Sequence, residues 1–387
     1  MSHKMPRDIT HIILADEAAK AYKSKEILNN LSAFHMGCVA EDAFLYSLSP
    51  QLSTRLHGGL GDDTRAVALE MMDELKKEKN PHKRAIEKAF VCGYLCHMAA
   101  DCNFHPLIYS ISGSQLACNN RSKDDVALSK ACHRYAETWL DVYLMRDKHI
   151  SFKNFRPFRQ IVRNMAMRIH LDDFFTDCYQ NALKAKKYTW GDNLDLQAQF
   201  HNGMTRQFFV DKITQNQTVA GMLRKLDKVF HGRLKLYTSG FYNFSGDIPS
   251  RLTAGSFIHP VTGEIVQKSL ADLERDTIQY SVQFFRAVDD YIKYGDREAF
   301  LKAVPNINGD TGLENSKLVD IRKIITQEDF ASMIGERLDT REKVKLMMRE
   351  NSRRTSDNLS VANRHKKTVH KSTSSKNIYK KQQAKMR

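Results

Sequence analysis

The sequence predicts an all-α fold, a bundle of several helices interrupted by one irregular or hairpin-forming insertion. Apolar residues recur with the helical period of 3.6 over most of the first 294 residues, and the alternating pattern of strands is rare. The 387-residue chain is long enough to bury a sizeable core. Helices are expected over 11–30, 64–78, 83–104, 124–147, 194–230 and 269–294.

Helix breakers and turn residues divide these segments. The breakers are Gly58, Gly59, Pro81 and Pro106, and we expect the helix over 83–104 to end at the last of them. Asp124 opens the helix over 124–147, where a carboxylate suits the positive end of the helix dipole. The stretch 239–264 is rich in Gly, Ser, Pro and aromatic residues, so it is expected to be a packed loop or short hairpin rather than a linker.

The positive charge is concentrated in the C-terminal segment. Residues 341–387 carry a net charge of +12 out of +15 for the chain, and residues 351–387 are also poor in apolar side chains. Such a segment cannot bury enough surface to offset the entropy of ordering, so a disordered basic tail is expected. The tail is either a solvated surface segment or a contact for anionic lipid. Specific nucleic-acid binding is not expected, because only Tyr379 interleaves with the basic residues.

The N-terminal segment lacks the features of a secretory signal peptide. Lys4, Arg7 and Asp8 precede an apolar run, 12–14, that is too short for such a signal. The seven cysteines are odd in number and irregularly spaced, which favours a reducing compartment over a disulfide framework. The sequence therefore predicts a cytoplasmic location, with signal-independent export as the alternative.

Eight side chains that can bind metal follow one another in the N-terminal third of the chain. Residues four apart lie on one face of a helix, so His97 with Asp101, and His133 with Glu137, each present two ligands to one point. Zinc binds imidazole nitrogen and carboxylate oxygen, and eight ligands are too many for one tetrahedral ion. The candidate ligands are His11, Asp42, His57, His97, Asp101, His105, His133 and Glu137.

Each of these residues has an ordinary structural role as the alternative to metal binding, and this alternative is stronger for some residues than for others. Taken singly, His11, at the start of a helix, would more often be a capping or surface residue, and Asp42, after a run of small residues, a helix-capping aspartate. His97 and Asp101 lie in the most apolar helix of the chain, where burying them is costly unless they pair with each other or bind a metal. For His133 and Glu137 the alternative is a surface pair.

The ordered series resembles the zinc-dependent phospholipase C family of bacterial enzymes. Order, residue type and approximate spacing agree from residue 5 to about 145, and loosely to about 294. The motifs that carry the resemblance are Thr10-His11, the Gly-x-x-x-x-Asp segment from Gly37 to Asp42, His57 to Thr64, the Gly-Tyr-Leu-x-His-x-x-x-Asp segment from Gly93 to Asp101, Phe104-His105-Pro106, and His133 to Glu137.

The resemblance implies a zinc cleft between helices, with two zinc ions and a site for a third. Its ligand sets would be Asp42, His57, His97 and Asp101 for one ion, His105, His133 and Glu137 for a second, and His11 with Asp101 as a bridge for the third. The family completes the third site with an N-terminal tryptophan, which this chain lacks. Ser2, His3 or water would have to take its place.

The resemblance, which does not extend to the tail, and the composition of the C-terminal segment together predict a domain organisation. We expect a catalytic domain at 1–295, a helical extension at 296–350 and the disordered basic tail at 351–387. The sequence indicates neither an oligomeric state nor a head-group preference.

The expected activity is hydrolysis of a phosphodiester. Zinc can lower the pKa of water from 15.7 to about 7 and neutralise charge on a phosphoryl group. Asp42 is expected to orient or deprotonate the attacking water. For a glycerophospholipid at a membrane surface, the products would be diacylglycerol and a phosphorylated head group.

Two alternatives stay open at this point. One is a single-strand nuclease or nucleotidase of the same zinc fold, whose members typically carry Asp at the position of Glu137. The other is a non-catalytic helical protein stabilised by zinc, in which every metal site is closed. The aromatic stretch 239–264 would either face acyl chains or pack as ordinary core.

Overall fold

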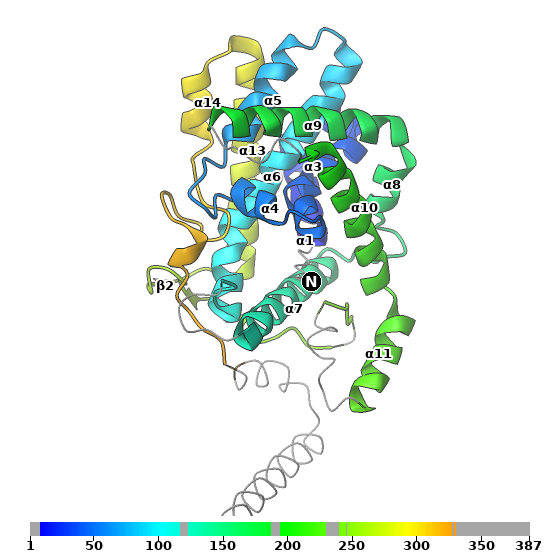
Figure 1. Cartoon of the computed structure of the whole chain (residues 1–387), viewed down its shortest axis with the longest axis vertical. Coiled ribbons are helices and arrows are strands. Elements are labelled where there is room, and N and C mark those ends of the chain that lie inside the picture. Colours follow the sequence, from blue (N-terminus) through cyan, green and yellow to red (C-terminus); the bar gives the residue numbers. More distant parts are fainter. Residues whose placement is uncertain are drawn as a thin grey trace, which may run out of the picture. The chain divides into compact units, whose positions relative to one another are not determined.

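The computed structural model describes residues 8–116, 123–186, 194–229, 240–244, 246–326 and 329, and within them the predicted all-α fold is confirmed (Figure 1). The only sheet in this part is a two-stranded hairpin. The helices are α1 (Asp8–Tyr22), α2 (Lys25–Asn29), α3 (Leu31–Ala43), η1 (Phe44–Tyr46), α4 (Gln51–Leu56), α5 (Ala66–Lys77), α6 (Pro81–Ser112), α7 (Lys123–Asp147), α8 (Pro157–Arg163), α9 (Met165–Ala185), α10 (Leu196–Thr214), α11 (Gln217–Val229), α13 (Leu270–Tyr294), α14 (Arg297–Ala303) and η2 (Leu318–Asp320).

Helix α6 is the central element, and it is longer than predicted. It begins after Asn80, whose side chain accepts hydrogen bonds from two backbone amides of the first turn. The expectation that it ends at Pro106 is wrong, because it continues to Ser112. Proline costs one backbone hydrogen bond. Buried apolar residues on both sides of it, including Phe104 and Ile108, stabilise the helix through packing.

Other helix boundaries in the structure also differ from the predicted ones. The predicted helix over 11–30 is α1 followed by α2, and α1 begins at Asp8, so His11 lies within its first turn. The predicted helix over 194–230 is two helices, α10 and α11, which Gln215 and Asn216 separate. Helices α3, α4, α8 and α9 were not predicted.

Helices α3 and α6 cross at two glycines. A β-carbon on Gly37 would lie 2.1 Å from the carbonyl oxygen of Phe90, and one on Gly93 would lie 2.0 Å from that of Phe34. No side chain fits between the backbones here. Helix α13 packs along α6 and α1, and the buried aromatic rings of Phe44, Phe175 and Phe200 contact one another near α9 and α10.

The predicted hairpin insertion is present at the end of the aromatic stretch. Strands β1 (Phe257–Ile258) and β2 (Ile265–Val266) pair antiparallel, with Ile258 opposite Ile265. Tyr242 is fully buried and its ring packs against Phe152. Tyr242 therefore packs as core, whereas Phe241 and Phe244 are half-buried and Ile258 and Ile265 of the hairpin are exposed.

The chain divides into two units at Phe330, and all described residues belong to the first, Met1–Phe330. The loop after α14 folds back onto the ends of α4 and α6. The boundaries expected at 295 and 350 stay predictions, and the tail at 351–387 lies outside the described residues.

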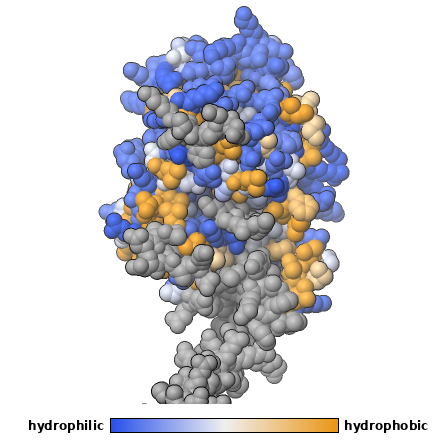
Figure 2. Space-filling model, viewed as in Figure 1, coloured by the Kyte–Doolittle hydropathy of each residue, from blue (hydrophilic) through white to orange (hydrophobic). Residues whose placement is uncertain are grey.

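The described surface is mostly hydrophilic on the face shown in Figure 2, with smaller hydrophobic patches. None of the helices in the described part is long and apolar enough to cross a membrane.

Candidate metal centre

Five elements bring the eight predicted ligands together at one place. His11 comes from α1, Asp42 from the last turn of α3, and His57 from the residue that follows α4. The other ligands lie on α6 and α7 at the helical spacing that the sequence indicates. Seven of the eight, together with Glu41, supply ligand atoms to three groups, each within 4.8 Å. The first group is Glu41, His57 and His97, the second is His105, His133 and Glu137, and the third is His11, His97 and Asp101, while Asp42 lies beside the first.

Asp101 connects these groups. Its Oδ2 lies 2.8 Å from Nε2 of His57 and 3.1 Å from Nε2 of His97. Its Oδ1 lies 3.4 Å from Nε2 of His11 and 3.5 Å from Nε2 of His105. One buried carboxylate thus faces imidazoles from three segments of the chain, an arrangement typical of a bridging ligand.

The first group contains a carboxylate that the sequence did not predict. Asp42 Oδ1 lies 3.5 Å from Nε2 of His57, and Asp42 Oδ2 lies 3.9 Å from Nε2 of His97. The Nε2 atoms of the two histidines are 3.3 Å apart. Glu41 is 1% exposed and its Oε2 lies 4.0 Å from Nε2 of His57. The sequence did contain a signal for Glu41, because it directly precedes Asp42 and follows an apolar run, where a buried carboxylate needs a partner.

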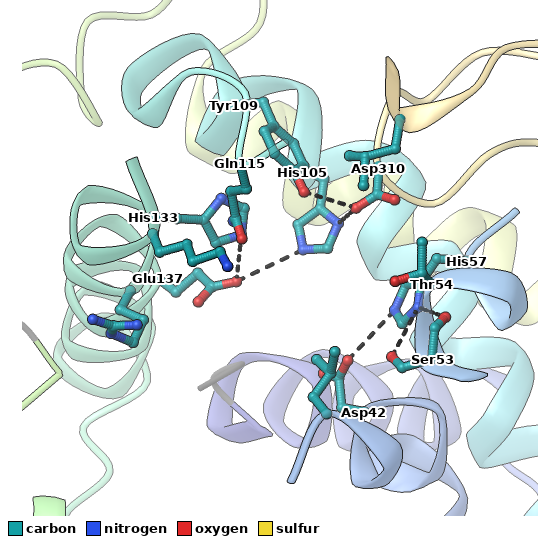
Figure 3. Close-up of a pocket in the computed structure, with 14 residues that line it drawn as sticks. Asp42, Ser53, Thr54, His57, His105, Tyr109, Gln115, His133, Glu137 and Asp310 are labelled. Atoms are coloured by element: carbon teal, nitrogen blue, oxygen red, sulfur yellow. Dashed lines mark hydrogen bonds and ion pairs between the residues drawn. The ribbon is translucent and has the colours of Figure 1, made fainter. Parts of the chain in front are cut away.

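The second group joins α6 to α7. His133 Nε2 lies 3.0 Å from Oε1 of Glu137, as expected for residues four apart on one helix face. Nε2 of His105 lies 3.7 Å from the same oxygen, from across the space between the helices (Figure 3). The pair is buried, so the surface-pair alternative for His133 and Glu137 is wrong.

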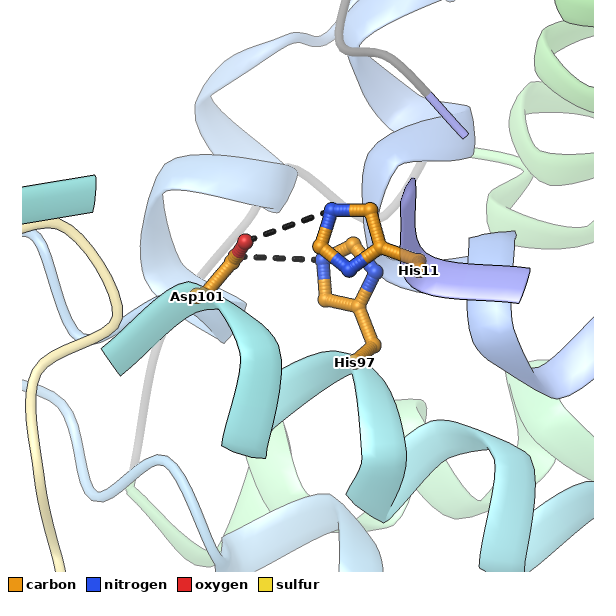
Figure 4. Close-up of side chains that lie close together, drawn as sticks. All are labelled: His11, His97 and Asp101. Atoms are coloured by element: carbon orange, nitrogen blue, oxygen red, sulfur yellow. Dashed lines mark ion pairs between the residues drawn. The ribbon is translucent and has the colours of Figure 1, made fainter. Parts of the chain in front are cut away.

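His11 completes the third group from α1. Its ring stacks on that of His97 with centroids 4.1 Å apart and an interplanar angle of 14°, and both imidazoles face Asp101 (Figure 4). Ser2 and His3, the residues considered as further ligands here, lie outside the described residues. Cys92 and Cys96 are buried and belong to none of the three groups.

Four of the histidines share one hydrogen-bonding arrangement. Their Nδ1 atoms contact oxygen atoms of the surrounding structure: Ser53 O at 2.7 Å from His57, Cys38 O at 2.8 Å from His97, Gly309 O at 3.1 Å from His105, and Ser112 Oγ at 3.1 Å from His133. Each Nε2 is therefore directed toward the carboxylates. This is the arrangement of histidine ligands in metal sites, where the outer nitrogen is held by a neighbouring acceptor.

Burial and the close charges shift the pKa values of the acidic residues in different directions. Burial raises the pKa of Glu41 to about 7 and that of Asp42 to about 6. Burial also acts to raise the pKa of Asp101, but His105, His97 and His57 hold it well below its usual value. His133 and His105 similarly lower the pKa of Glu137 to about 2, against the effect of burial.

The imidazoles respond to the same neighbours. Burial acts to lower the pKa of each, but Asp101 and Asp42 raise the pKa of His97 to about 10, and Asp101 raises that of His57 well above its usual value. Asp101 and Glu137 raise the pKa of His105 to about 9. For His11, burial and the charge of His97 together lower the pKa to about 3. The carboxylates thus favour positive charge at the centre of the cluster.

These donors fit zinc. They are imidazole nitrogens and carboxylate oxygens, the ligand types that zinc accepts outside thiolate sites. Oε1 of Glu41 and Oε2 of Glu137 are buried without a hydrogen-bond partner, a costly arrangement that a bound cation would relieve.

A cavity lies beside the first and second groups. Asp42, His57, His105, His133 and Glu137 line it, and so do Lys130, Arg134, Tyr109 and Asp310. Asp310 lies far beyond the last motif in the sequence. Its Asn-Gly-Asp-Thr-Gly context indicates only a turn, so nothing in the sequence placed it near the ligands.

Replacing Glu137 by Ala is expected to lower the zinc content of the purified protein by about one ion per chain, because it removes the only carboxylate of the second group. Metal analysis after dialysis measures this content. Glu298→Ala, at an exposed residue of α14, is the matched control and should keep the full content. An unchanged zinc content in Glu137→Ala would show that the second group does not bind metal.

Comparison with known proteins gives one match. Residues 10–191 match the family model described as zinc dependent phospholipase C, and the matched range contains all eight predicted ligands. No curated protein and no solved structure matches the chain.

Proposed function

Since residues 10–191 match the zinc dependent phospholipase C family, we propose that the chain is a phospholipase C that hydrolyses glycerophospholipids to diacylglycerol and a phosphorylated head group. The observation that carries this proposal is the connection of two buried ligand groups by Asp101 beside one cavity. Glu137 also favours the lipid-cleaving family over the related nucleases.

We further propose how the ligands are shared. Asp42, His57, His97 and Asp101 would hold one ion, with Glu41 close enough to contribute. His105, His133 and Glu137 would hold a second ion, and His11 would take part in a third site with Asp101. When bound, zinc activates water and neutralises negative charge on the phosphoryl group.

Residues of the chain supply the other requirements of the reaction. Asp42 lines the cavity, and burial raises the pKa of its carboxylate to about 6, which supports the proposal that it orients the attacking water and accepts its proton. Lys130 and Arg134 line the same cavity from α7, one turn away from His133 and Glu137. Their positive charges would attract the phosphodiester anion.

The decisive assay compares two substrates. Purified protein is expected to release diacylglycerol from vesicles of phosphatidylcholine and phosphatidylglycerol, and to release no acid-soluble nucleotides from single-stranded DNA. A zinc chelator should lower lipid cleavage by about 100-fold or more, because without zinc neither activation of water nor neutralisation of the phosphoryl charge would be available. Added zinc should restore the rate.

Two results would contradict the proposal. Lipid cleavage that is unaffected by the chelator would exclude the zinc mechanism. Chelator-sensitive release of nucleotides without release of diacylglycerol would favour the nuclease.

A further inference from the structure

A loop outside the family match contacts histidines of two ligand groups. Residues 306–312 follow α14, well beyond residue 191, yet they lie against the ends of α4 and α6. Three polar residues of this loop, Asn308, Asp310 and Thr311, are buried. Buried polar residues in a loop are unusual, and their hydrogen bonds show what they hold in place.

The backbone amide and the backbone carbonyl of Gly309 each contact a different histidine. Its amide donates to the carbonyl oxygen of His57 over 2.8 Å. Its carbonyl oxygen accepts from Nδ1 of His105 over 3.1 Å, which leaves Nε2 of that ring directed toward Asp101 and Glu137. A β-carbon at this position would lie 3.2 Å from Cδ2 of His57, which is closer than an ordinary contact, so an added side chain would press on that ring and shift it by a few tenths of an ångström.

Asp310 extends these contacts to the second group. Its Oδ1 accepts from the hydroxyl of Tyr109 over 2.9 Å and lies 4.0 Å from Nδ1 of His105 (Figure 3). The ring of Tyr109 packs edge-on against that of His133, with centroids 4.7 Å apart. Asp310 therefore orients the aromatic ring that supports His133.

Asn308 fixes the loop itself. Its Nδ2 donates to the carbonyl oxygen of Gly58, next to His57, over 2.7 Å. Its Oδ1 accepts from the amides of Asp310 and Thr311, both over 2.9 Å. One hydrogen bond thus attaches the loop to the residues that follow α4, and two more hold the turn within the loop together. These bonds give Gly309 and Asp310 one defined position.

We propose that Asn308, Gly309 and Asp310 are positioning residues of the metal centre, and that the centre is incomplete without this loop. The loop holds His57, His105 and, through Tyr109, His133. Neighbours that orient metal ligands typically change metal affinity by 10- to 100-fold when they are replaced. This inference rests on zinc binding by the proposed enzyme, but not on its substrate.

The test measures zinc affinity in the full-length chain by competition with a chromophoric chelator. Gly309→Ala is expected to weaken zinc binding by about 10- to 100-fold, and Asp310→Ala by about 10-fold. Asp310→Asn keeps an oxygen that accepts from Tyr109 and should restore most of the affinity. Gly221→Ala is the control, because a β-carbon there meets nothing within 4 Å. This control should stay within about twofold of the parent.

A loss of folding must be separated from a loss of positioning. Chemical unfolding of the metal-free variants measures their free energy of unfolding without zinc. A positioning role requires that the loss of zinc-binding free energy exceeds the loss of this unfolding free energy. In the Tyr109→Phe background, Asp310→Ala should have little further effect, because the two residues act through one hydrogen bond.

Two results would overturn the inference. The first is zinc affinity within twofold of the parent in both Gly309→Ala and Asp310→Ala. The second is a decrease that matches the loss of stability of the metal-free protein. A chain that binds zinc in this loop-dependent way but does not cleave lipid would contradict the proposed function and leave this inference standing.

Discussion

Replacing Asp101 by Ala is expected to abolish phosphodiester hydrolysis and to remove most of the bound zinc. Asp101 is the residue that faces His11, His57, His97 and His105 at distances of 2.8 to 3.5 Å. Without it, both ligand groups lose their shared carboxylate. Four imidazoles would then remain close together in a buried space, with one fewer carboxylate to balance the positive charge of the zinc ions or of protonated rings.

The same substitution should also destabilise the metal-free protein. Removing one partner of a buried charge pair costs about 3–5 kcal/mol in the free energy of unfolding, because the other partner stays buried without compensation. Chemical denaturation of the chelated protein measures this cost, and metal analysis with the vesicle assay measures the functional loss. If Asp101→Ala fails to fold, Asp101→Asn keeps the shape of the side chain and removes its charge.

Asp290→Asn is the matched control for this prediction. Asp290 is exposed on α13 and makes no ion pair among those found in the described part of the chain, so its replacement should change stability by about 0.5 kcal/mol or less. Full zinc content and full activity in Asp101→Asn would refute the central place of this carboxylate.

Replacing Gly93 by Ala is expected to cause the largest loss of stability outside the metal centre. The added β-carbon would lie 2.0 Å from the carbonyl oxygen of Phe34 and 3.0 Å from the amide nitrogen of Cys38. Both atoms belong to the backbone of α3, so α3 and α6 must move apart. Overpacking of a well-packed interior costs about 1–3 kcal/mol and sometimes more, and a backbone clash belongs at the upper end.

This prediction has a second, functional consequence. Cys38 accepts from Nδ1 of His97 through its carbonyl oxygen, and Asp42 lies at the end of the same helix. Separating the helices should therefore weaken zinc binding as well as stability. Thermal unfolding and the chelator competition measure the two effects. Gly221→Ala, on the described part of α11, provides the control, and equal stability of both variants would contradict the tight crossing.

Several ligands could be predicted because their geometry is local. Residues four apart on a helix share a face whatever the fold, so His97 with Asp101, and His133 with Glu137, followed from spacing alone. The whole series of eight was recognised through its motifs, and the family match over residues 10–191 confirms that resemblance. Their assignment to particular ions stays a prediction, as do the expected location and the basic tail's partner.

Other features were missed because they depend on contacts between distant segments. Glu41 was missed although it adjoins the predicted Asp42, because only the packing of α3 against α6 and the end of α4 brings its carboxylate close to His57 and His97. The extent of α6 was underestimated because packing around Pro106 outweighs the local preference of proline to end a helix. The predicted helix over 194–230 ignored a break that no proline or glycine marks.

The sequence alone determined the helical class of the protein, the residue types of a zinc centre and their order along the chain, since all three are written in local periodicity and motif spacing. Only the tertiary structure decided that Asp101 is the common partner of four histidines, and that Gly309 and Asp310 contact His105 and Tyr109 from a loop about 200 residues away. The physical reason is that a hydrogen bond across the chain depends on where two helices cross and how closely their backbones approach, which no local pattern encodes.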